Sequence, residues 1–145
     1  MKVSDVMTRD VVLAHPNQTI CDAAKMMAES DAGALPVGEN DRLVGVITDR
    51  DIAVRAVAKH LSPDTPVREI MSSQVLYCYE DEDIERVAQN MGGNQVRRLA
   101  VLNRDKRLVG IVSIGDVSHG VPPRVAGQAI ADISKPGGSN SQTRH

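Results

Sequence analysis

The pattern of apolar and polar positions in this chain occurs twice. A helical pattern, with apolar residues at i, i+3, i+4 and i+7, is formed by Ile20, Ala23, Ala24 and Met27 and recurs as Ile84, Val87, Ala88 and Met91. The two copies lie 64 residues apart (84 − 20). Short runs rich in strand-forming residues precede them, Val11–Leu13 in one copy and Val75–Tyr77 in the other. This spacing indicates two copies of one structural unit.

Two further apolar runs follow each helix and are too short to be helices. Polar residues separate the runs, at 39–42 in the first copy and 103–107 in the second, so each pair predicts a β-hairpin. A second helix is expected from Asp51 to about His60, and Gly120 with Pro122-Pro123 cuts its counterpart short. We expect this helix to be buried through Ile52, Ala53, Ala56 and Val57. Each copy therefore reads β-α-β-β-α.

These elements divide the sequence into two repeats, a linker and a tail. The predicted boundaries are 1–60 for repeat 1, 61–66 for the linker, 67–120 for repeat 2 and 121–145 for the tail. Within the tail we expect a short helix from Val125 to Ile133 and disorder after Pro136. A unit of this size buries only about 60% of its chain surface. The repeats are therefore expected to pack face to face about a pseudo-twofold axis.

Composition and charge narrow the classes of partner. The chain has 17 Lys and Arg against 19 Asp and Glu, a net charge of −2, which gives no electrostatic reason to expect nucleic acid or a membrane. Tyr77 and Tyr79 are its only aromatic residues, too few for base stacking. The charged N-terminal residues do not resemble a signal peptide, and no apolar run approaches a transmembrane length. The prediction is a cytoplasmic protein.

The sequence offers no catalytic or metal-binding pattern. Cys21 and Cys78 are too few and too distant for a disulfide framework, so both are expected to be free, buried thiols. The four histidines are scattered, and none lies four residues from another histidine or a cysteine, so no metal site is predicted. Nucleophile-elbow, phosphate-loop and zinc-protease motifs are missing. The chain is predicted not to be an enzyme and to require no cofactor.

Three motifs occur in both copies in the same order. They are Asp5–Thr8, Ala34–Val37 and Leu43–Ile52 in the first copy, and Glu69–Ser72, Arg98–Val101 and Leu108–Val117 in the second. From Val3 to about Gly120 the chain resembles a CBS-domain pair, or Bateman module, of the stand-alone bacterial type. The resemblance implies an α+β fold of two tandem β-α-β-β-α CBS repeats, a homodimer, and two clefts that bind AMP, ADP, ATP, S-adenosylmethionine or related ligands.

The resemblance also implies which residues bind the ligand. In this family a hydroxyl-x-x-Asp motif at the end of the last strand holds the ribose, and a first-strand hydroxyl comes from the opposite repeat. Cleft A is then expected to contain Thr8, Arg97, Arg98, Ser113 and Asp116. Cleft B is expected to contain Ser72, Ala34, Thr48, Arg50 and Asp51. A carboxylate can accept hydrogen bonds from both vicinal ribose hydroxyls.

Each of these assignments has a simpler alternative. The hydroxyl and Asp residues of both motifs are also the types that cap helices. Arg97 and Arg98 suit phosphate because a guanidinium pairs with it in a fork, and strand alternation allows only one of them to point inward. The same pair could be a solvated strand edge, and Arg50 a solvated residue at a helix start. Since cleft B has Gly33 and Ala34 in place of the arginines, cleft A is expected to be the better nucleotide site.

Two functions remain open from the sequence. The first is a sensor, in which a bound adenine nucleotide changes the packing of the repeats and an unidentified effector protein responds. The alternative is a structural dimerisation or interaction module with vestigial clefts. Ligand binding discriminates between them because it raises the stability of the folded state.

Overall fold

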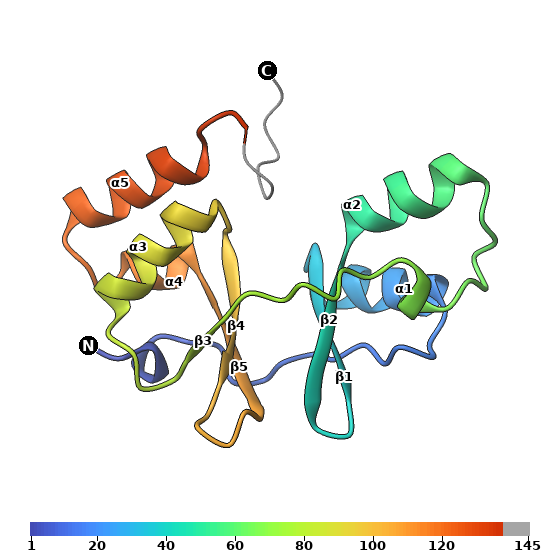
Figure 1. Cartoon of the computed structure of the whole chain (residues 1–145), viewed down its shortest axis with the longest axis horizontal. Coiled ribbons are helices and arrows are strands. Elements are labelled where there is room, and N and C mark those ends of the chain that lie inside the picture. The colour runs from blue at the N-terminus through green and yellow to red at the C-terminus, as the bar shows by residue number, and fades with distance from the viewer. Residues whose placement is uncertain (138–145) are drawn as a thin grey trace. The chain divides into compact units, whose positions relative to one another are not determined.

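The computed structural model describes residues 1–137 and divides the chain into two compact units (Figure 1). Unit 2 is Val12–Val75, and unit 1 is Met1–Val11 together with the chain from Leu76 onward. The units therefore do not coincide with the sequence repeats, because the two repeats exchange their first segments. The segment that leads each repeat, residues 3–8 or residues 67–72, lies in the unit built mainly from the other repeat. We call these two segments the leading segments.

Unit 2 is a β-hairpin with one long helix and one irregular helix. Helix α1 spans Ile20–Ser30, β1 spans Ala34–Glu39, and β2 spans Arg42–Thr48. A helical run follows as α2 (Asp49–Asp51), a π-helical turn (Ile52–Ala56) and a 3₁₀ turn (Val57–Lys59), and a further 3₁₀ turn covers Val67–Glu69. The strands are antiparallel, and both central residues of the turn between them have positive φ, as type I′ hairpin turns require. The buried core comprises Ala14, Ile20, Ala23, Met27, Leu35, Val37, Ile47, Ala56, Val67 and Ile70.

Unit 1 has a three-stranded sheet in the order β3-β4-β5. Its elements are a 3₁₀ turn (Val3–Asp5), β3 (Tyr77–Tyr79), α3 (Ile84–Asn94), β4 (Arg98–Leu102), β5 (Leu108–Ser113), α4 (Ile114–Ser118) and α5 (Pro123–Ile133). Strand β3 is parallel to β4, and β4 is antiparallel to β5. Helix α5 packs on α3 and α4 and buries Val125, Ala126, Ala129 and Ile133 in the core of the unit.

The mixed helix and strand content of both repeats is confirmed, and the differences are local. Val11–Leu13 forms no strand, and only the next residue, Ala14, makes a parallel bridge, to Val37. In unit 1 the corresponding strand is Tyr77–Tyr79, two residues later than predicted. Helix α5 begins two residues before Val125 because proline is favourable in a first helical turn.

The burial predicted for the second helix of unit 2 is wrong in part. Of the four residues expected to be inside, Ala56 is fully buried and Ile52 is half-buried, but Ala53 is exposed and Val57 is 66% exposed. The π turn explains the difference, since i→i+5 hydrogen bonds widen the helix and rotate an α-helical face away from the core. Part of the predicted tail, residues 138–145, lies outside the described residues.

Candidate functional site

The last strand of each unit ends in a capping box. At the end of β5, the Asp116 N–H donates to Ser113 Oγ at 3.1 Å, and the Ser113 N–H donates to Asp116 Oδ2 at 2.9 Å. At the end of β2, Thr48 and Asp51 make the same two hydrogen bonds, each at 3.0 Å. The helix-capping interpretation is therefore correct. Each capping box uses Oδ2 of its aspartate, and Oδ1 makes no hydrogen bond within the box.

The leading segments place a second hydroxyl residue on each of these strands. In unit 1 the Thr8 N–H donates to Ile111 O at 2.8 Å, and the Ile111 N–H donates back to Thr8 O at 2.9 Å. In unit 2 the same exchange joins Ser72 and Val46, with both hydrogen bonds at 2.9 Å. Ile111 and Val46 each lie two residues before the hydroxyl of the capping box. Thr8 thus lies in the same unit as Ser113 and Asp116, and Ser72 in the same unit as Thr48 and Asp51.

A glycine in each last strand allows the leading segment to approach this closely. A Cβ added at Gly110 would lie 2.7 Å from Thr8 O and 2.9 Å from Met7 Sδ. A Cβ added at Gly45 would lie 2.8 Å from the carbonyl oxygen of Ser72. Both distances are shorter than van der Waals contact allows. Sequence reasoning did not assign these glycines a role, although the repeated Leu-Val-Gly at 43–45 and 108–110 was the available signal.

The two predicted arginines of unit 1 have different positions relative to the capping box. Arg98 is the first residue of β4 and the register partner of Ser113, and directly opposed residues of antiparallel strands lie on one face of the sheet. Arg97 precedes the strand, and its carbonyl oxygen accepts from the Ile114 N–H at 2.9 Å. Both side chains are exposed. Arg98 is therefore the arginine that shares a face with Ser113.

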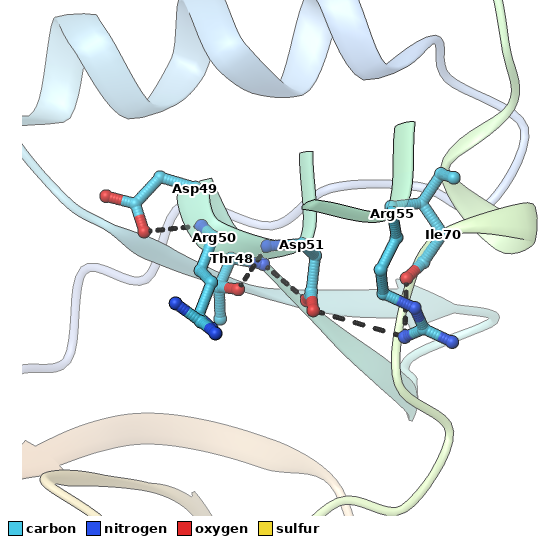
Figure 2. A network of polar contacts seen from close by, with 6 residues as sticks. All are labelled: Thr48, Asp49, Arg50, Asp51, Arg55 and Ile70. Carbon is cyan, nitrogen blue, oxygen red and sulfur yellow. Dashed lines mark hydrogen bonds and ion pairs between the residues drawn. The ribbon is translucent and has the colours of Figure 1, made fainter. Parts of the chain in front are cut away.

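Unit 2 has no cation at the position of Arg98, because the register partner of Thr48 is Ala34. Its nearest charged groups come from the helical run, where the Asp49 carboxylate accepts from the Arg50 N–H at 2.8 Å. Figure 2 shows the Asp49 carboxylate and the Arg50 guanidinium pointing in different directions. A Cβ at Gly33, the counterpart of Arg97, would lie 3.0 Å from Asp49 Oδ2. A carboxylate thus occupies the space where a side chain at residue 33 would begin.

Two hollows of unit 1 lie away from the predicted ligand residues. One, of about 380 Å³, lies between α3 and α5 and is lined by Glu85, Gln89, Arg124, Val125, Gln128, Ala129 and Asp132. A second, of about 410 Å³, is lined by Gly92, Gly93, Gln95, Asp132, Lys135, Pro136 and Gly137. Neither contains a predicted ligand residue. Among residues 1–137, no three His, Cys, Asp or Glu side chains are grouped so as to hold a metal ion.

The two tyrosines form a cluster around the tip of the second hairpin. Their rings meet edge to face with centroids 5.7 Å apart, and the Arg104 guanidinium lies 4.1 Å from the Tyr79 ring centroid. Arg104 also makes two hydrogen bonds to the Asp81 carboxylate, at 2.9 and 2.8 Å, and these lower the pKa of Asp81. Arg104 therefore covers part of one face of the Tyr79 ring.

No helix within residues 1–137 is both long enough and apolar enough to cross a membrane.

Comparisons with known proteins agree with the repeat structure. The CBS-domain family model matches residues 3–57 and again residues 67–122. The CBS domain-containing protein YhcV of Bacillus subtilis is 40% identical over 133 residues, which cover 91% of this chain and 94% of that protein. Hypoxic response protein 1 of Mycobacterium tuberculosis is 35% identical over 134 residues, which cover 91% of this chain and 93% of that protein.

Solved structures of similar proteins include complexes with adenosine compounds. The CBS domain pair of protein MJ0100, in complex with 5′-methylthioadenosine and S-adenosyl-L-methionine, superposes with a TM-score of 0.72 at 32% identity, over 82% of this chain and 94% of that one. CBSX2 in complex with AMP gives a TM-score of 0.72 at 26% identity, with the same coverage. Hypoxic Response Protein I, with two coordinated zinc ions, gives a TM-score of 0.75 at 35% identity, over 84% of this chain and all of that one.

The family match falls on both sequence repeats and includes both capping boxes. The structural neighbours share the α+β fold with two CBS repeats. The chain belongs to the CBS-domain family, as a tandem pair of CBS domains.

Proposed function

We propose that this protein is a regulatory module that binds an adenosyl ligand and signals the bound state to a partner protein. The observation that carries the proposal is the same in both units: a Ser or Thr and an Asp cap the helix that follows the last strand, and a second hydroxyl residue is hydrogen-bonded to that strand through its backbone. CBS proteins of the same fold have been solved with AMP and with 5′-methylthioadenosine and S-adenosylmethionine. The proposed role is binding and not catalysis.

The proposed ribose contact uses the carboxylate oxygen that the capping box leaves over. Within residues 1–137, Asp116 Oδ1 makes no hydrogen bond or ion pair, so both of its lone pairs are available to ribose hydroxyls. The Ser113 hydroxyl accepts one bond in the box and retains its own proton to donate. Arg98, on the face of Ser113, is the proposed partner of a ligand phosphate. Thr8 and Arg97 complete the proposed site of unit 1.

The two proposed sites differ in charge. In unit 1, Arg97 and Arg98 lie at the start of β4, with Arg98 opposite Ser113 of the capping box. The box contains one carboxylate, that of Asp116. In unit 2 the corresponding positions are Gly33 and Ala34, and Asp49 adds a second carboxylate beside Asp51, so that Arg50 is the cation nearest in sequence. Arg55 lies 4.0 Å from Asp51 Oδ1, so the two carboxylates of unit 2 are balanced by Arg50 and Arg55, whereas unit 1 has two arginines against one carboxylate. A phosphate is therefore attracted more strongly to the first arrangement than to the second. Unit 1 is therefore proposed as the better site for a phosphorylated nucleotide, with Ser72, Ala34, Thr48, Arg50 and Asp51 forming the second site.

Calorimetric titration with AMP, ADP, ATP, NAD and S-adenosylmethionine tests the function. We expect saturable binding of at least one phosphorylated ligand and a loss of affinity of about 10- to 100-fold in Asp116→Ala, because hydrogen bonds to a charged group contribute about 1.5–3 kcal/mol. Asp105→Ala, which removes an exposed carboxylate from the hairpin loop of the same unit, should bind as the wild type does. Circular dichroism checks that the variant, which loses the Asp116 side-chain bond of the capping box but keeps Ser113 as N-cap, remains folded.

Two results would contradict these assignments. If none of the five ligands binds, the regulatory proposal fails and the alternative function, an interaction module with vestigial clefts, replaces it. If Asp116→Ala and Thr8→Ala leave nucleotide affinity unchanged while Asp51→Ala abolishes it, the order of the two sites is reversed.

We also propose that the protein forms a homodimer through unit 2. In unit 1, Ala88 and Gly92 on α3 are buried, and a Cβ at Gly92 would lie 3.4 Å from Ala129 Cα of α5. The matching residues of α1, Ala24 and Ala28, are exposed. The helical run after β2 also exposes Val54 (46%) and Val57 (66%). We propose these exposed apolar residues of α1 and the helical run as the dimer interface, because apolar residues gathered on one surface mark protein–protein contacts.

Sedimentation of Val57→Glu tests the dimer. A glutamate in an apolar interface loses its hydration without gaining a partner, so the variant is expected to be monomeric at concentrations where the wild type is dimeric. The matched control is Ile130→Glu, which makes the same kind of change at an exposed apolar residue of α5 and should leave the dimer intact. Dissociation by Ile130→Glu and not by Val57→Glu would place the interface on unit 1 instead.

A further inference from the structure

Arg55 connects two parts of the proposed site of unit 2. Its Nη1 donates to Ile70 O, in the leading segment, at 2.9 Å. The same nitrogen lies 4.0 Å from Asp51 Oδ1, the carboxylate oxygen that the capping box does not use. Figure 2 shows the guanidinium between the Asp51 carboxylate and the Ile70 carbonyl. One side chain therefore contacts both the aspartate of the capping box and the segment that carries Ser72.

The sequence of unit 1 does not repeat this connection. Counted from the capping boxes, Arg55 is the fourth residue after Asp51, and the fourth residue after Asp116 is Gly120. A Cβ added at Gly120 would overlap Ile84 Cδ1 and lie 2.6 Å from Met1 Sδ. A larger side chain at this position would require Ile84 and Met1 to move, and the glycine present offers no counterpart to the Arg55 guanidinium.

The geometry points to Arg55 as a positioning residue of unit 2, one that ties Asp51 to the leading segment and so holds the adenosyl site in its binding arrangement. This inference rests on the proposed function, since it assumes that Asp51 contacts the ligand. Asp51 is the less exposed partner, with its side chain 19% exposed against 49% for Arg55, so the arginine reaches the carboxylate from the solvent side. Ile70 is itself almost fully buried, at 1% exposure, and gives the guanidinium a fixed anchor.

The contacts of Arg55 with Asp51 and Ile70 are expected to raise the affinity of unit 2 for its ligand. A guanidinium held by a backbone carbonyl cannot follow the carboxylate, so it restricts the rotation of the Asp51 side chain about a position in which Oδ1 remains within reach of a ligand hydroxyl. Without Arg55, the ligand itself has to order Asp51 and residues 67–72 relative to each other. This cost lowers the affinity of the ligand. Within residues 1–137, Asp116 Oδ1 of unit 1 has no such restraint, so the loss of Arg55 should affect unit 2 alone.

Nuclear magnetic resonance titration of the whole chain separates the two units. The amides of Gly33 and Gly45 report on unit 2, and those of Gly110 and Gly115 report on unit 1. The probes are AMP, 5′-methylthioadenosine and S-adenosylmethionine, which share the adenosine group and differ in charge. The variants are Arg55→Met, which removes both contacts of Nη1, and Arg55→Lys, which keeps the positive charge on a shorter side chain.

For Arg55→Met we expect about three- to tenfold weaker binding at the unit 2 amides, the loss of roughly one net hydrogen bond, and unchanged binding at the unit 1 amides. Arg55→Lys should recover part of the loss. The matched control is Arg68→Met, since Arg68 also lies in the leading segment of unit 2 and donates to Asn17 Oδ1, away from the capping box. This control should bind as the wild type does.

Three results would overturn the inference. Binding at the unit 2 amides within about twofold of the wild type in Arg55→Met would show that the tie does not position the site. Equal weakening at both units, or by Arg68→Met as well, would show a general effect on the fold. If none of the three probes moves the unit 2 amides in the wild-type protein, the inference fails together with the proposed adenosyl site of unit 2, and this result is distinct from the other two.

Discussion

Replacing Gly110 by valine should unfold unit 1 or release its leading segment. The new side chain would start 2.7 Å from Thr8 O and 2.9 Å from Met7 Sδ, where no rotamer relieves the clash because the first contact is with backbone. We expect a loss of unfolding free energy of about 3 kcal/mol, at the upper end of the usual cost of overpacking. Urea unfolding followed by circular dichroism measures this loss, and hydrogen exchange at the Thr8 and Ile111 amides shows whether the segment has been released.

The control for this variant is a glycine with space around it. A Cβ added at Gly127, in the middle of α5, would meet no neighbouring atom of residues 1–137 within 4 Å. Gly127→Ala should therefore raise stability by about 0.5–1 kcal/mol through the lower entropy of the unfolded chain. If Gly110→Val were as stable as the wild type, the hydrogen bonds between Thr8 and Ile111 could not hold the leading segment as close as described.

Cys78 should resist alkylation far more strongly than Cys21. Burial, with a smaller contribution from the charge of Glu82, raises the pKa of the Cys78 thiol from 9.0 to about 12. A difference of three pKa units makes the reactive thiolate about a thousandfold rarer at pH 8 than in an unperturbed thiol. Iodoacetamide labelling with peptide mass spectrometry should therefore detect modification of half-buried Cys21 long before Cys78, and unfolding in urea should make the two rates similar. Equal rates in the folded protein would contradict the burial of Cys78.

The same thiol makes stability depend on pH in the alkaline range. The unfolded chain loses the Cys78 proton near pH 9.0, whereas the folded chain keeps it until about pH 12. The unfolded state is thus favoured as pH rises above about 9, and the contribution of this group is fully present only below that value. Thermal unfolding between pH 8 and 10.5 should show a steeper decline for the wild type than for Cys78→Ala.

Much of the secondary structure could be predicted from the sequence because it is encoded locally. Helices α1 and α3 each display a periodic apolar face, and the hairpins are marked by polar turns. The N-cap of α1 was also readable, since Thr19 accepts from the Asp22 N–H at 3.0 Å. The N-cap position of α3 was readable in the same way, because Asp83 occupies it, although its side chain makes no cap bond.

The candidate sites were less accessible to local reasoning. That Thr8 belongs with Ser113 followed only from the family resemblance, since a pairing across about a hundred residues leaves no periodic signal. The π turn at Ile52–Ala56 was missed because its sequence is compatible with an ordinary α-helix. The contact of Arg55 with Ile70 O depends on that altered helix and on the exchanged segment together, so neither repeat predicts it alone.

The exchange of leading segments sets an order of events during synthesis. Unit 2 is contiguous, Val12–Val75, so all of its residues are available once residue 75 has left the ribosome. Residues 3–8 leave earlier, but their partner strand ends at Ser113, which at about 5–20 residues per second arrives a few seconds later. Val3 and Met7, both buried in the finished protein, stay exposed to solvent through that interval. Residues 3–8 are therefore synthesised before unit 2 but become buried only after unit 2 is complete. Slow translation between residues 76 and 113 would lengthen the exposure of residues 3–8 to proteases and chaperones.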